Sequence, residues 1–370
     1  MDAVAIAVGA VIVLVVLADA ADTLVSTRLR SGRWWPTEVF YRGTWKLWRA
    51  MSRGVRKGPR REQFLSLFGP LSLLVLLGLW TAGAIVGWSL VWWGLRGSFV
   101  DPPTHWVDTV YYSGVTYFSV GFGDVLPGTG AVRLLSIAEA FTGLGLLGLV
   151  IGFLPSLYSA YQQREAQLAL LDDLTEHRIV AVNLAASRVV DGDVRRLESF
   201  FEDWERWTAE VLETHMTFPM LMLFRSQRPG QSWVTAMGVV ADAAAGYVGA
   251  VPGTDTSAAR FMQRRAALCL RTLSERIGVQ PDFGPRITEE MWRYGYEQLG
   301  PLGLPLRPFE ETWERVEALR AEHAPWMEGL IEALDAPRGF WGHTVDGELA
   351  EPADGAIAPA APDEGVGGPK

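Results

Sequence analysis

Six consecutive residues have the types and spacing needed to hold a dehydrated cation. Residues 119–124 read Ser-Val-Gly-Phe-Gly-Asp and lie between two long apolar segments. Carbonyl oxygens can replace the water shell of an ion only when several consecutive carbonyls point the same way. In an ordinary strand they alternate, and turning them together requires positive φ angles, which cost little only for glycine. Gly121 and Gly123 therefore predict a row of backbone oxygens facing a pore. The side chains of Val120 and Phe122 should then pack behind that row.

The segment before these glycines predicts the element that positions them. Asp101-Pro102-Pro103-Thr104 supplies a cap residue followed by prolines that a first helical turn tolerates. A helix over residues 102–118 would end just before the glycines and aim the negative end of its dipole at the cavity, which favours a cation there. Such a re-entrant element is allowed at membrane depth only where protein or water surrounds it. A β-turn between two membrane helices would leave this upstream segment unexplained.

Two apolar segments that flank this loop are long enough to cross a membrane. Residues 63–95 carry no charged side chain, and residues 134–161 are apolar apart from Glu139. We therefore expect an outer helix over residues 68–95 and an inner helix over residues 132–162.

A third apolar segment, residues 3–17, is only just long enough to cross. A cleaved signal peptide is the alternative interpretation, helped by the small residues Ala18 and Ala20. The chain, however, starts Met-Asp-Ala without the basic region that such peptides have. We therefore expect a retained transmembrane helix over residues 1–20.

The distribution of charge predicts how these helices are oriented. Between Ala21 and Glu62 there are eleven Lys or Arg residues against three acids, whereas residues 96–105 contain one arginine. Cytoplasmic loops of membrane proteins carry the excess of basic residues. The basic linker, residues 21–66, is therefore expected in the cytoplasm, with the N-terminus and the filter loop outside and the C-terminal half cytoplasmic. The single cysteine, Cys269, fits a reducing compartment on that side.

Aromatic and basic residues recur at helical spacing within the basic linker. They are Trp34, Tyr41, Trp45 and Trp48 on one face and Arg42, Lys46, Arg49 and Arg53 on the neighbouring face. This pattern predicts a helix in the headgroup plane, with its rings in the membrane and its cations toward anionic lipid. A voltage sensor is disfavoured, because sensor arginines are separated by apolar residues within a full span, whereas Gly54, Gly58 and Pro59 interrupt this region.

From outer helix to inner helix, residues 67–162, the chain resembles the two-transmembrane pore module of prokaryotic potassium channels. The resemblance implies a homotetramer, because one filter loop per chain requires four chains to close a ring of carbonyls. It also implies the following ion contacts. K⁺ would be held by the hydroxyl of Ser119 and the carbonyls of Val120, Gly121, Phe122 and Gly123, with Thr116 at the inner end of the pore helix and a ring of Asp124 carboxylates at the outer mouth.

The chain departs from the family pattern at the supports of the filter. Phe122 lacks the hydroxyl of the usual tyrosine, which implies a less braced wall. Tyr111 and Tyr112 stand where the family often has tryptophans, and Tyr111 is expected to donate to Asp124. Val115 replaces a glutamate that some members pair with that aspartate. The carbonyl register is intact, so selectivity for K⁺ should survive these changes.

The inner helix contains residues typical of a hinge and a gate. Gly143 lies where inner helices of this family commonly hinge, although small residues also let membrane helices pack closely. Pro155 removes a backbone hydrogen bond and should kink the helix. Leu154 or Tyr158 would then narrow the pore.

Glu139 is the carboxyl group within the inner span. Burying it ionised and unpaired would be costly, so it should be protonated or have a partner. We expect it to brace the pore helix from behind, at Ser113 or at a backbone amide, rather than to contact the ion.

Residues 163–345 are predicted to form an all-helical cytoplasmic domain. Apolar and charged residues recur at helical spacing over residues 197–211, 257–277 and 310–334, and the inner helix has the composition to continue into residues 164–190. Neither a Gly-x-Gly-x-x-Gly after a strand nor a short-strand rhythm is present, which argues against dinucleotide-binding and cyclic-nucleotide domains. The histidines are too scattered to suggest a metal site, and no pattern indicates an enzyme.

Two segments of this domain leave alternatives open. Residues 234–251 are apolar enough to span a membrane, but Asp242 favours a buried core helix. The apolar, basic and aromatic residues 216–233 would either bind an anionic ligand or pack in the core, and packing is favoured.

The composition and net charge of the chain limit the kinds of partner that it can bind. The tail, residues 346–370, is rich in Ala, Pro, Gly and acids and should be disordered. The whole chain carries −9 and the basic linker +8, so −17 lies elsewhere, which disfavours nucleic-acid binding.

The sequence therefore predicts an all-α protein of the plasma membrane, a tetrameric potassium-channel pore module joined to an α-helical cytoplasmic domain that gates it. The expected partners are membrane lipid, K⁺ in the filter and an unidentified ligand of the cytoplasmic domain, with no organic cofactor and no enzyme activity. The alternatives are a weakly selective cation channel and a receptor or scaffold with a vestigial pore. The stimulus that opens the pore is not readable from the sequence.

Overall fold

The computed structural model describes residues 2–25, 35–55, 58–175, 181, 184, 187–189, 192–227, 231–253, 256–283 and 287–337. The predicted tail, residues 346–370, lies outside them. The α-helices are α1 (Asp2–Leu24), α2 (Pro36–Ser52), α3 (Pro59–Ser66), α4 (Phe68–Gly94), α5 (Trp106–Tyr117), α6 (Gly130–Thr175), α8 (Arg195–Thr217), α9 (Trp233–Ala250), α10 (Ser257–Ile277), α11 (Glu289–Leu299), α12 (Phe309–Arg320) and α13 (Ala324–Leu334). Three 3₁₀ helices complete the regular elements of these ranges: η1 (Arg96–Ser98), η2 (Pro219–Leu223) and η3 (Gly300–Leu302).

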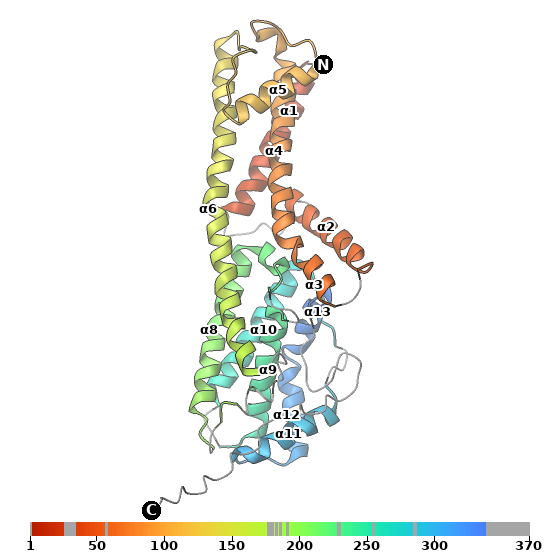
Figure 1. Cartoon of the computed structure of the whole chain (residues 1–370), viewed down its shortest axis with the longest axis vertical. Coiled ribbons are helices and arrows are strands. Elements are labelled where there is room, and N and C mark those ends of the chain that lie inside the picture. Colours follow the sequence, from red (N-terminus) through yellow and green to blue (C-terminus); the bar gives the residue numbers. More distant parts are fainter. Residues whose placement is uncertain are drawn as a thin grey trace, which may run out of the picture.

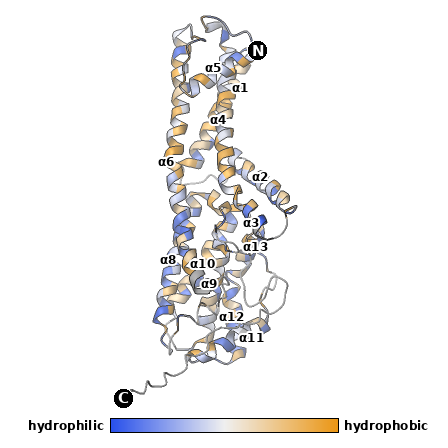
Figure 2. Ribbon diagram, viewed as in Figure 1, coloured by the Kyte–Doolittle hydropathy of each residue, from blue (hydrophilic) through white to orange (hydrophobic). Residues whose placement is uncertain are grey.

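The molecule is elongated, and α6 runs along most of its length (Figure 1). At one end α1, α4 and α5 lie beside the first part of α6; we call this group the pore half. At the other end lie α8–α13, which we call the helical domain. The pore half is strongly apolar on its outside, whereas the helical domain is mixed (Figure 2). The predicted class, an all-α membrane protein, is confirmed by this architecture.

Four helical stretches of the described chain are long and apolar enough to cross a membrane: α1, the α3–α4 stretch, α6 and α9. In the first three, 39% of the residues or fewer are buried within the described chain, so each has a side left free to face lipid. Every residue of α9 is instead buried among other helices of the helical domain. This burial agrees with the prediction of a core helix rather than a span.

Helix α1 packs closely on α4. A Cβ atom at Gly9 would overlap the carbonyl oxygen of Gly87, so the two backbones approach where both residues lack side chains. Near its end, the buried Asp19 accepts hydrogen bonds from the Trp80 indole of α4 at 2.8 Å and from the Thr37 hydroxyl of α2 at 2.6 Å. Helix α1 therefore forms part of the packed structure, extends to Leu24 and fixes the start of α2.

Helix α2 forms where the basic linker predicts a helix, but its aromatic residues face the protein. The Trp45 indole donates to the carbonyl of Ala333 in α13 at 3.0 Å, and the Trp48 indole donates to that of Phe64 in α3 at 3.1 Å. Tyr41 packs in an apolar cluster with residues of α4, α6 and η2. These three rings are thus partly covered by other helices of the chain, which the prediction did not anticipate. The position of α2 in the headgroup plane stays a prediction, and Trp34 lies outside the described residues. The larger exposed side chains here are Val39, Arg42, Lys46, Leu47, Met51 and Arg53.

Helix α6 continues without a break through Pro155 and ends at Thr175, beyond the predicted end at residue 162 (Figure 1). A proline inside a helix removes one hydrogen bond but does not end the helix when packing holds both sides. Phe153 and Leu157 provide that packing, since both are buried against η2. The pore half and the helical domain thus share one continuous helix.

The helical domain is built around α9. Helices α8 and α10 begin and end close to the predicted limits, but the predicted run over residues 310–334 is divided into α12 and α13 at Ala321–His323. The break brings His323 beside Asp242 of α9, with Nε2 and Oδ1 2.9 Å apart, and Arg320 donates to the same oxygen at 2.6 Å. Burial alone would raise the pKa of Asp242, but the charge of Arg320 and the hydrogen bond with His323 hold it at about 2.

Candidate ion-conduction site

The pore helix begins later than predicted. Helix α5 starts at Trp106, and the two prolines before it remain outside the helix. The carboxylate of Asp108, one turn into the helix, accepts hydrogen bonds from the backbone amides of Thr104 and His105 at 3.2 and 3.0 Å. A carboxylate in the first turn also lies favourably in the helix dipole. Asp108 rather than Asp101 therefore determines where the pore helix starts.

The pore helix ends by joining directly to the filter loop. The amide of Ser119 donates to the carbonyl of Thr116 at 3.0 Å, and the amide of Val120 donates to that of Val115 at 2.9 Å. This pair of bonds closes the last turn of α5 and requires a left-handed residue between helix and loop, usually glycine. Ser119 has that conformation with φ of 57°, which is strained for a residue with a side chain.

Along the filter loop the sign of the backbone angle φ alternates from residue to residue. Gly121 and Gly123 have φ of 64° and 78°, so residues 119, 121 and 123 are left-handed and the two between them are not. No atom lies within 4 Å of where a Cβ would stand on either glycine. The conformation, and not a lack of space, therefore requires glycine at both positions. Alternating hand is the backbone property that turns successive carbonyls to one side.

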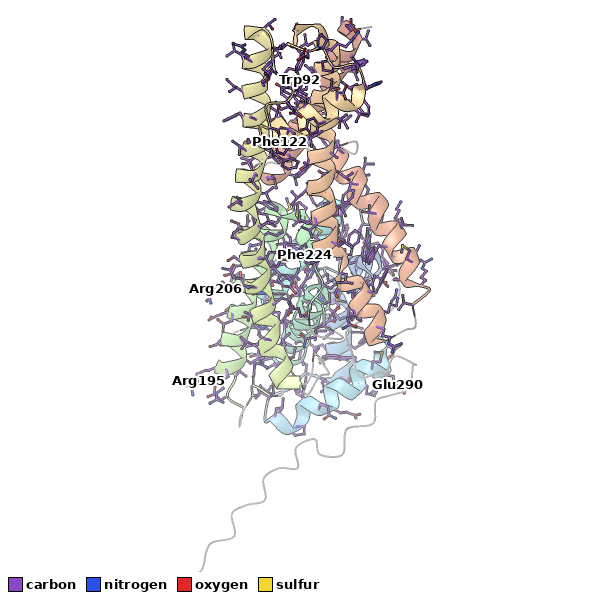
Figure 3. The ribbon with its side chains drawn as sticks, turned by 45° about the horizontal axis from the view of Figure 1, so that its top comes forward. Trp92, Phe122, Arg195, Arg206, Phe224 and Glu290 are labelled. Carbon is purple, nitrogen blue, oxygen red and sulfur yellow. The ribbon has the colours of Figure 1, made fainter. Side chains whose placement is uncertain are left out.

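The two larger filter side chains are not covered by their own chain. Val120 is 53% exposed and Phe122 is 69% exposed, whereas packing behind the filter was expected for both (Figure 3). A single protomer has no wall at this position, because α4 and α6 lie on the other side of α5. The expected packing is therefore absent within one chain.

Behind the pore helix, Glu139 of α6 is fully buried and has two donors. The Ser113 hydroxyl donates to one carboxylate oxygen at 2.5 Å, and the Trp92 indole of α4 donates to the other at 2.7 Å. Ser113 also lies 3.1 Å from the carbonyl oxygen of Ile85. One carboxyl group thus joins the outer helix, the pore helix and the inner helix behind the filter.

A second contact joins the same three elements nearer the outer mouth. The hydroxyl groups of Tyr112 in α5 and Ser136 in α6 are 2.6 Å apart. The ring of Tyr112 packs edge-to-face on Trp92 and Phe99, with centroids 5.5 and 5.0 Å away. Sequence reasoning identified neither Trp92 nor Ser136 as a support of the pore helix. The sequence does show one carboxyl group and several hydroxyl groups on helices expected to face each other. This pattern suggests a hydrogen-bonded contact, but it does not show that the indole of Trp92 donates to Glu139.

Contacts between the loops before α5 and after the filter fix the outer mouth of the expected pore. The side chains of Tyr111 and Asp124 lie near each other, and the hydrogen bond expected between them stays a prediction. The stretch after η1 pairs with the stretch after the filter, through the amide of Val100 and the carbonyl of Leu126 at 3.0 Å. A Cβ atom at Gly128 would come within 2.8 Å of the Ser98 carbonyl oxygen, so this close approach requires glycine. The loops on both sides of the filter are thus fixed to each other.

Gly143 of α6 lies against the last residue of the pore helix. A Cβ atom there would overlap the carbonyl oxygen of Tyr117. The small size of Gly143 is therefore needed for packing in this state, and its role as a hinge stays a prediction.

The predicted gate residues have different environments. Leu154 is half-buried and packs with Phe153 and Leu157 against η2, so it faces its own protomer. Pro155 and Tyr158 are exposed in the described chain, although Tyr158 lies one helical turn after Leu154 and its ring packs on that of Phe224. Which of the predicted pair narrows the pore stays a prediction.

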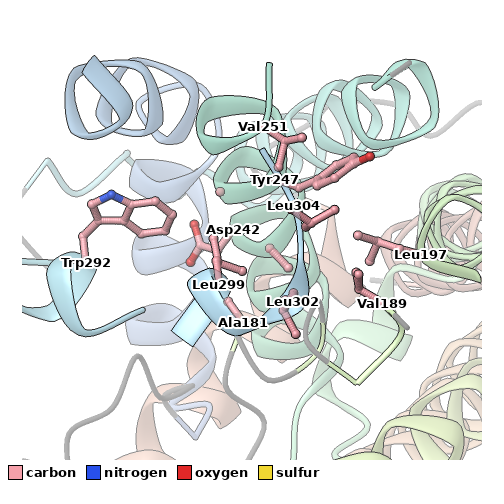
Figure 4. A pocket seen from close by; sticks show the side chains of 12 residues that line it. Ala181, Val189, Leu197, Asp242, Tyr247, Val251, Trp292, Leu299, Leu302 and Leu304 are labelled. Atoms are coloured by element: carbon pink, nitrogen blue, oxygen red, sulfur yellow. The ribbon is translucent and has the colours of Figure 1, made fainter. Parts of the chain in front are cut away.

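Cavities in the helical domain offer little room for a ligand. A cavity of about 20 Å³ beside Asp242, Tyr247 and Trp292 holds one water molecule at most (Figure 4). An open cleft of about 590 Å³ lies between α6 and α8 and contains Arg195. That arginine is already paired with Asp193 at 2.6 Å. Neither space identifies the ligand expected from the sequence, and none of the described residues form a cluster suited to a metal ion.

Comparison with known proteins supports the pore. Residues 74–159 match the family model described as "Ion channel". Over 222 residues the chain is 27% identical to the uncharacterized membrane protein YdjJ of Bacillus subtilis (strain 168), covering 56% of this chain and 63% of that protein. Over 42 residues it is 40% identical to the potassium channel protein kcv of Paramecium bursaria Chlorella virus 1, covering 11% and 45% respectively.

The chain thus spans less than two thirds of the length of either relative. No solved structure matches the chain significantly. The ion-channel match covers the outer helix, pore helix, filter and most of the membrane part of the inner helix. The resemblance of this segment to the potassium channel pore family is confirmed, and the chain is a membrane protein with an ion channel domain.

Proposed function

We propose that the chain is one subunit of a homotetrameric, potassium-selective channel in the plasma membrane. The observation that carries the proposal is the alternating hand of residues 119–123, with positive φ at Ser119, Gly121 and Gly123. In a regular strand only every second carbonyl faces a given side, whereas this backbone can turn consecutive carbonyls toward a cation. The match of residues 74–159 to an ion channel family supports the same conclusion.

Four copies are proposed because one chain leaves the site incomplete. Each chain supplies one filter loop, and a ring of carbonyls needs four. The exposed side chains of Val120 and Phe122 would pack against neighbouring copies, as would the exposed Phe141 and Ile151 of α6. Apolar side chains this exposed beside a polar loop favour a protein partner over water.

Within the tetramer each filter residue has one role. The Ser119 hydroxyl and the carbonyls of residues 120–123 replace the water shell of K⁺, and the Asp124 carboxylates concentrate cations at the outer mouth. Glu139 braces the pore helix through Ser113 and Trp92 and does not contact the ion.

The helical domain would set the opening of the pore. Helix α6 would line the conduction path and continues into the helical domain, so movement of the domain is transmitted to the inner helix without a flexible connection. The basic linker that precedes α4 supports a cytoplasmic position for this domain and an outward-facing filter. Tyr158 is the proposed narrowing of the pore.

Flux of K⁺ and Na⁺ into proteoliposomes containing the purified protein tests the proposal. We expect K⁺ flux to exceed Na⁺ flux, and Gly121→Ala to abolish flux because Ala is strained at φ of 64°. Gly278→Ala is the matched control, since Gly278 has φ of 75°, has open space around it and caps α10 far from the filter.

Size-exclusion chromatography of both variants checks that the tetramer forms. Equal permeability to the two ions would favour the weakly selective channel, which the missing hydroxyl at Phe122 allows. A wild-type protein without flux would favour a receptor or scaffold.

A further inference from the structure

One side chain of the helical domain lies between the outer and inner helices of the pore half. Phe224 follows η2 and is 4% exposed. Its ring packs edge-to-face on Tyr158 of α6 and lies 5.9 Å from the ring of Tyr161 (Figure 3). On its other side it contacts Gly69 of α4, where a Cβ atom would come within 2.8 Å of the Phe224 ring. The ring therefore fills the space between the inner ends of α4 and α6.

The backbone of Phe224 is fixed to the inner helix. The side chain of Arg164 in α6 is fully buried and donates to the carbonyls of Phe224 at 2.6 Å and Leu221 at 3.0 Å. Its other partners are Nε2 of His215 in α8, at 3.2 Å, and the carboxylate of the adjacent Glu165, at 3.0 Å. A buried arginine is stable only when its donors are paired, so these contacts hold η2 and α8 to one position on α6.

The next residue fixes the same segment to the outer helix and to the end of the domain. Arg225 forms an ion pair of 2.7 Å with Glu62 of α3, just before α4. It also donates at 2.9 Å to the carbonyl of Asp335, and at 3.2 Å to that of Leu334, at the end of α13. Phe224 is thus held between Arg164 and Arg225, one bound to the inner helix and one to the base of the outer helix.

We infer that Phe224 is a wedge through which the helical domain sets the distance between the outer and inner helices. The inference rests on the proposed function, in which the inner helix lies nearer the pore axis than the outer helix. A ring between the two then holds the inner helix toward the axis and narrows the pore at Tyr158. Withdrawal of the ring lets α6 move outward, toward α4, and the pore widens.

Two substitutions with opposite predicted effects test the wedge in single-channel recordings. Phe224→Ala removes the ring, so the open probability should rise about tenfold, the size of a typical coupling between sites. Gly69→Ala pushes the ring toward α6, so the open probability should fall. In the double variant the effect of Gly69→Ala should disappear, because the ring it displaces is gone.

Matched controls exist for both changes. Phe283 is 78% exposed on the helical domain, so Phe283→Ala should leave gating unchanged. A Cβ atom at Gly78 of α4 would contact no atom of the chain, so Gly78→Ala repeats the change of Gly69 without touching the wedge. Unitary conductance and the ratio of K⁺ to Na⁺ permeability should stay at wild-type values in all variants.

A distance measurement tests the wedge independently of conduction. Nitroxide labels are attached to Leu67→Cys and Ser159→Cys, two exposed positions, one just before α4 and one in α6. The buried Cys269 is first replaced by serine so that it is not labelled. Labelled chains are diluted with unlabelled ones, so the measured distance is the separation of α4 and α6 within one chain. Phe224→Ala should shorten this distance and Gly69→Ala should lengthen it, with Phe283→Ala at the wild-type value.

The two measurements separate the possible failures. Absence of flux in the wild type with shifted label distances would overturn the proposed function and leave the wedge intact. Unchanged label distances in both variants, or changes of the same sign, would overturn the wedge whatever the channel conducts. If the Phe224→Ala variant does not assemble, Gly69→Ala and its control Gly78→Ala test the wedge in the same two assays.

Discussion

The pore half and the helical domain each bury a carboxyl group, and they stabilise it in different ways. Glu139 has only neutral donors, the hydroxyl of Ser113 and the indole of Trp92. Asp242 is in contact with the cation Arg320 and with the imidazole of His323. In a membrane a second charge would add its own cost of burial, whereas in a water-soluble domain an arginine can extend from the surface to its partner. The pore half thus satisfies its buried carboxyl group with neutral donors, whereas the helical domain pairs its carboxylate with the charge of Arg320.

The largest effect is expected from neutralising Asp242. Asp242→Asn removes the negative charge and leaves Arg320 beside a buried amide, so the free energy of unfolding should fall by about 3–5 kcal/mol. Thermal unfolding of the detergent-solubilised protein measures this. Asp203→Asn is the control, because Asp203 is 60% exposed in its ion pair with Arg206 and such pairs contribute little. If Asp242→Asn lowered the free energy of unfolding by less than about 1 kcal/mol, the difference between Asp242 and Glu139 argued above would be contradicted.

A second effect of intermediate size tests how tightly the pore half is packed. Gly143→Ala places a methyl group where the carbonyl oxygen of Tyr117 lies, and the expected cost is about 1–3 kcal/mol with reduced K⁺ flux. Gly145→Ala is the control, since a Cβ atom there meets no atom of the chain. Full activity and stability of Gly143→Ala would show that α5 and α6 are loosely packed and would favour the hinge interpretation.

The stability of the helical domain should depend on pH through His215. Burial, and secondarily the charge of Arg164, holds the pKa of His215 well below 6.5. The unfolded chain then binds a proton that the folded chain does not, so stability is complete above pH 6.5 and falls as the pH drops below it. The slope should approach about 1.4 kcal/mol per pH unit. His215→Gln should flatten the profile, whereas the exposed His105→Gln should not, and an unchanged slope in His215→Gln would contradict this account.

The smallest effect is expected from Glu139→Gln. The amide oxygen can accept from Trp92, the amide nitrogen can donate to Ser113, and the Ser113 hydroxyl can then donate to Ile85. The second amide N–H is the one group left over, so the cost should be about 1 kcal/mol, while Glu139→Ala should cost about 2 kcal/mol by removing both hydrogen bonds. Thermal unfolding of the tetramer measures both. A cost for Glu139→Gln as large as that for Asp242→Asn would show that Glu139 is charged.

Local patterns in the sequence were sufficient for much of the pore. The glycines at 121 and 123 and the two long apolar segments are explained by backbone conformation and helix length, which depend on neighbouring residues. The helices over α8 and α10 follow equally from helical spacing. The start of the pore helix was misjudged because Asp101 and Asp108 are both suitable capping residues, and the prolines between them did not show which one caps the helix.

Contacts between distant residues could not be predicted in the same way. Trp45 and Trp48 have a spacing that suits either lipid or protein, and the choice depended on whether α3 and α13 reach α2. Trp92 had the composition of an interfacial residue, yet it binds Glu139, 47 residues away. The apolar and basic residues 216–233 were expected to pack, but the sequence did not show that Phe224 would pack between two membrane helices.

The sequence by itself determined the pattern of glycines between two apolar helices on which the proposed filter rests, because positive φ and apolar length are properties of short segments. Tertiary structure decided what supports this loop and what adjoins the proposed gate. Glu139 gained its donors, and Phe224 its position between α4 and α6, from helices far apart in the chain. A side chain's partners depend on how whole helices pack, and the composition of one helix face is compatible with several such partners.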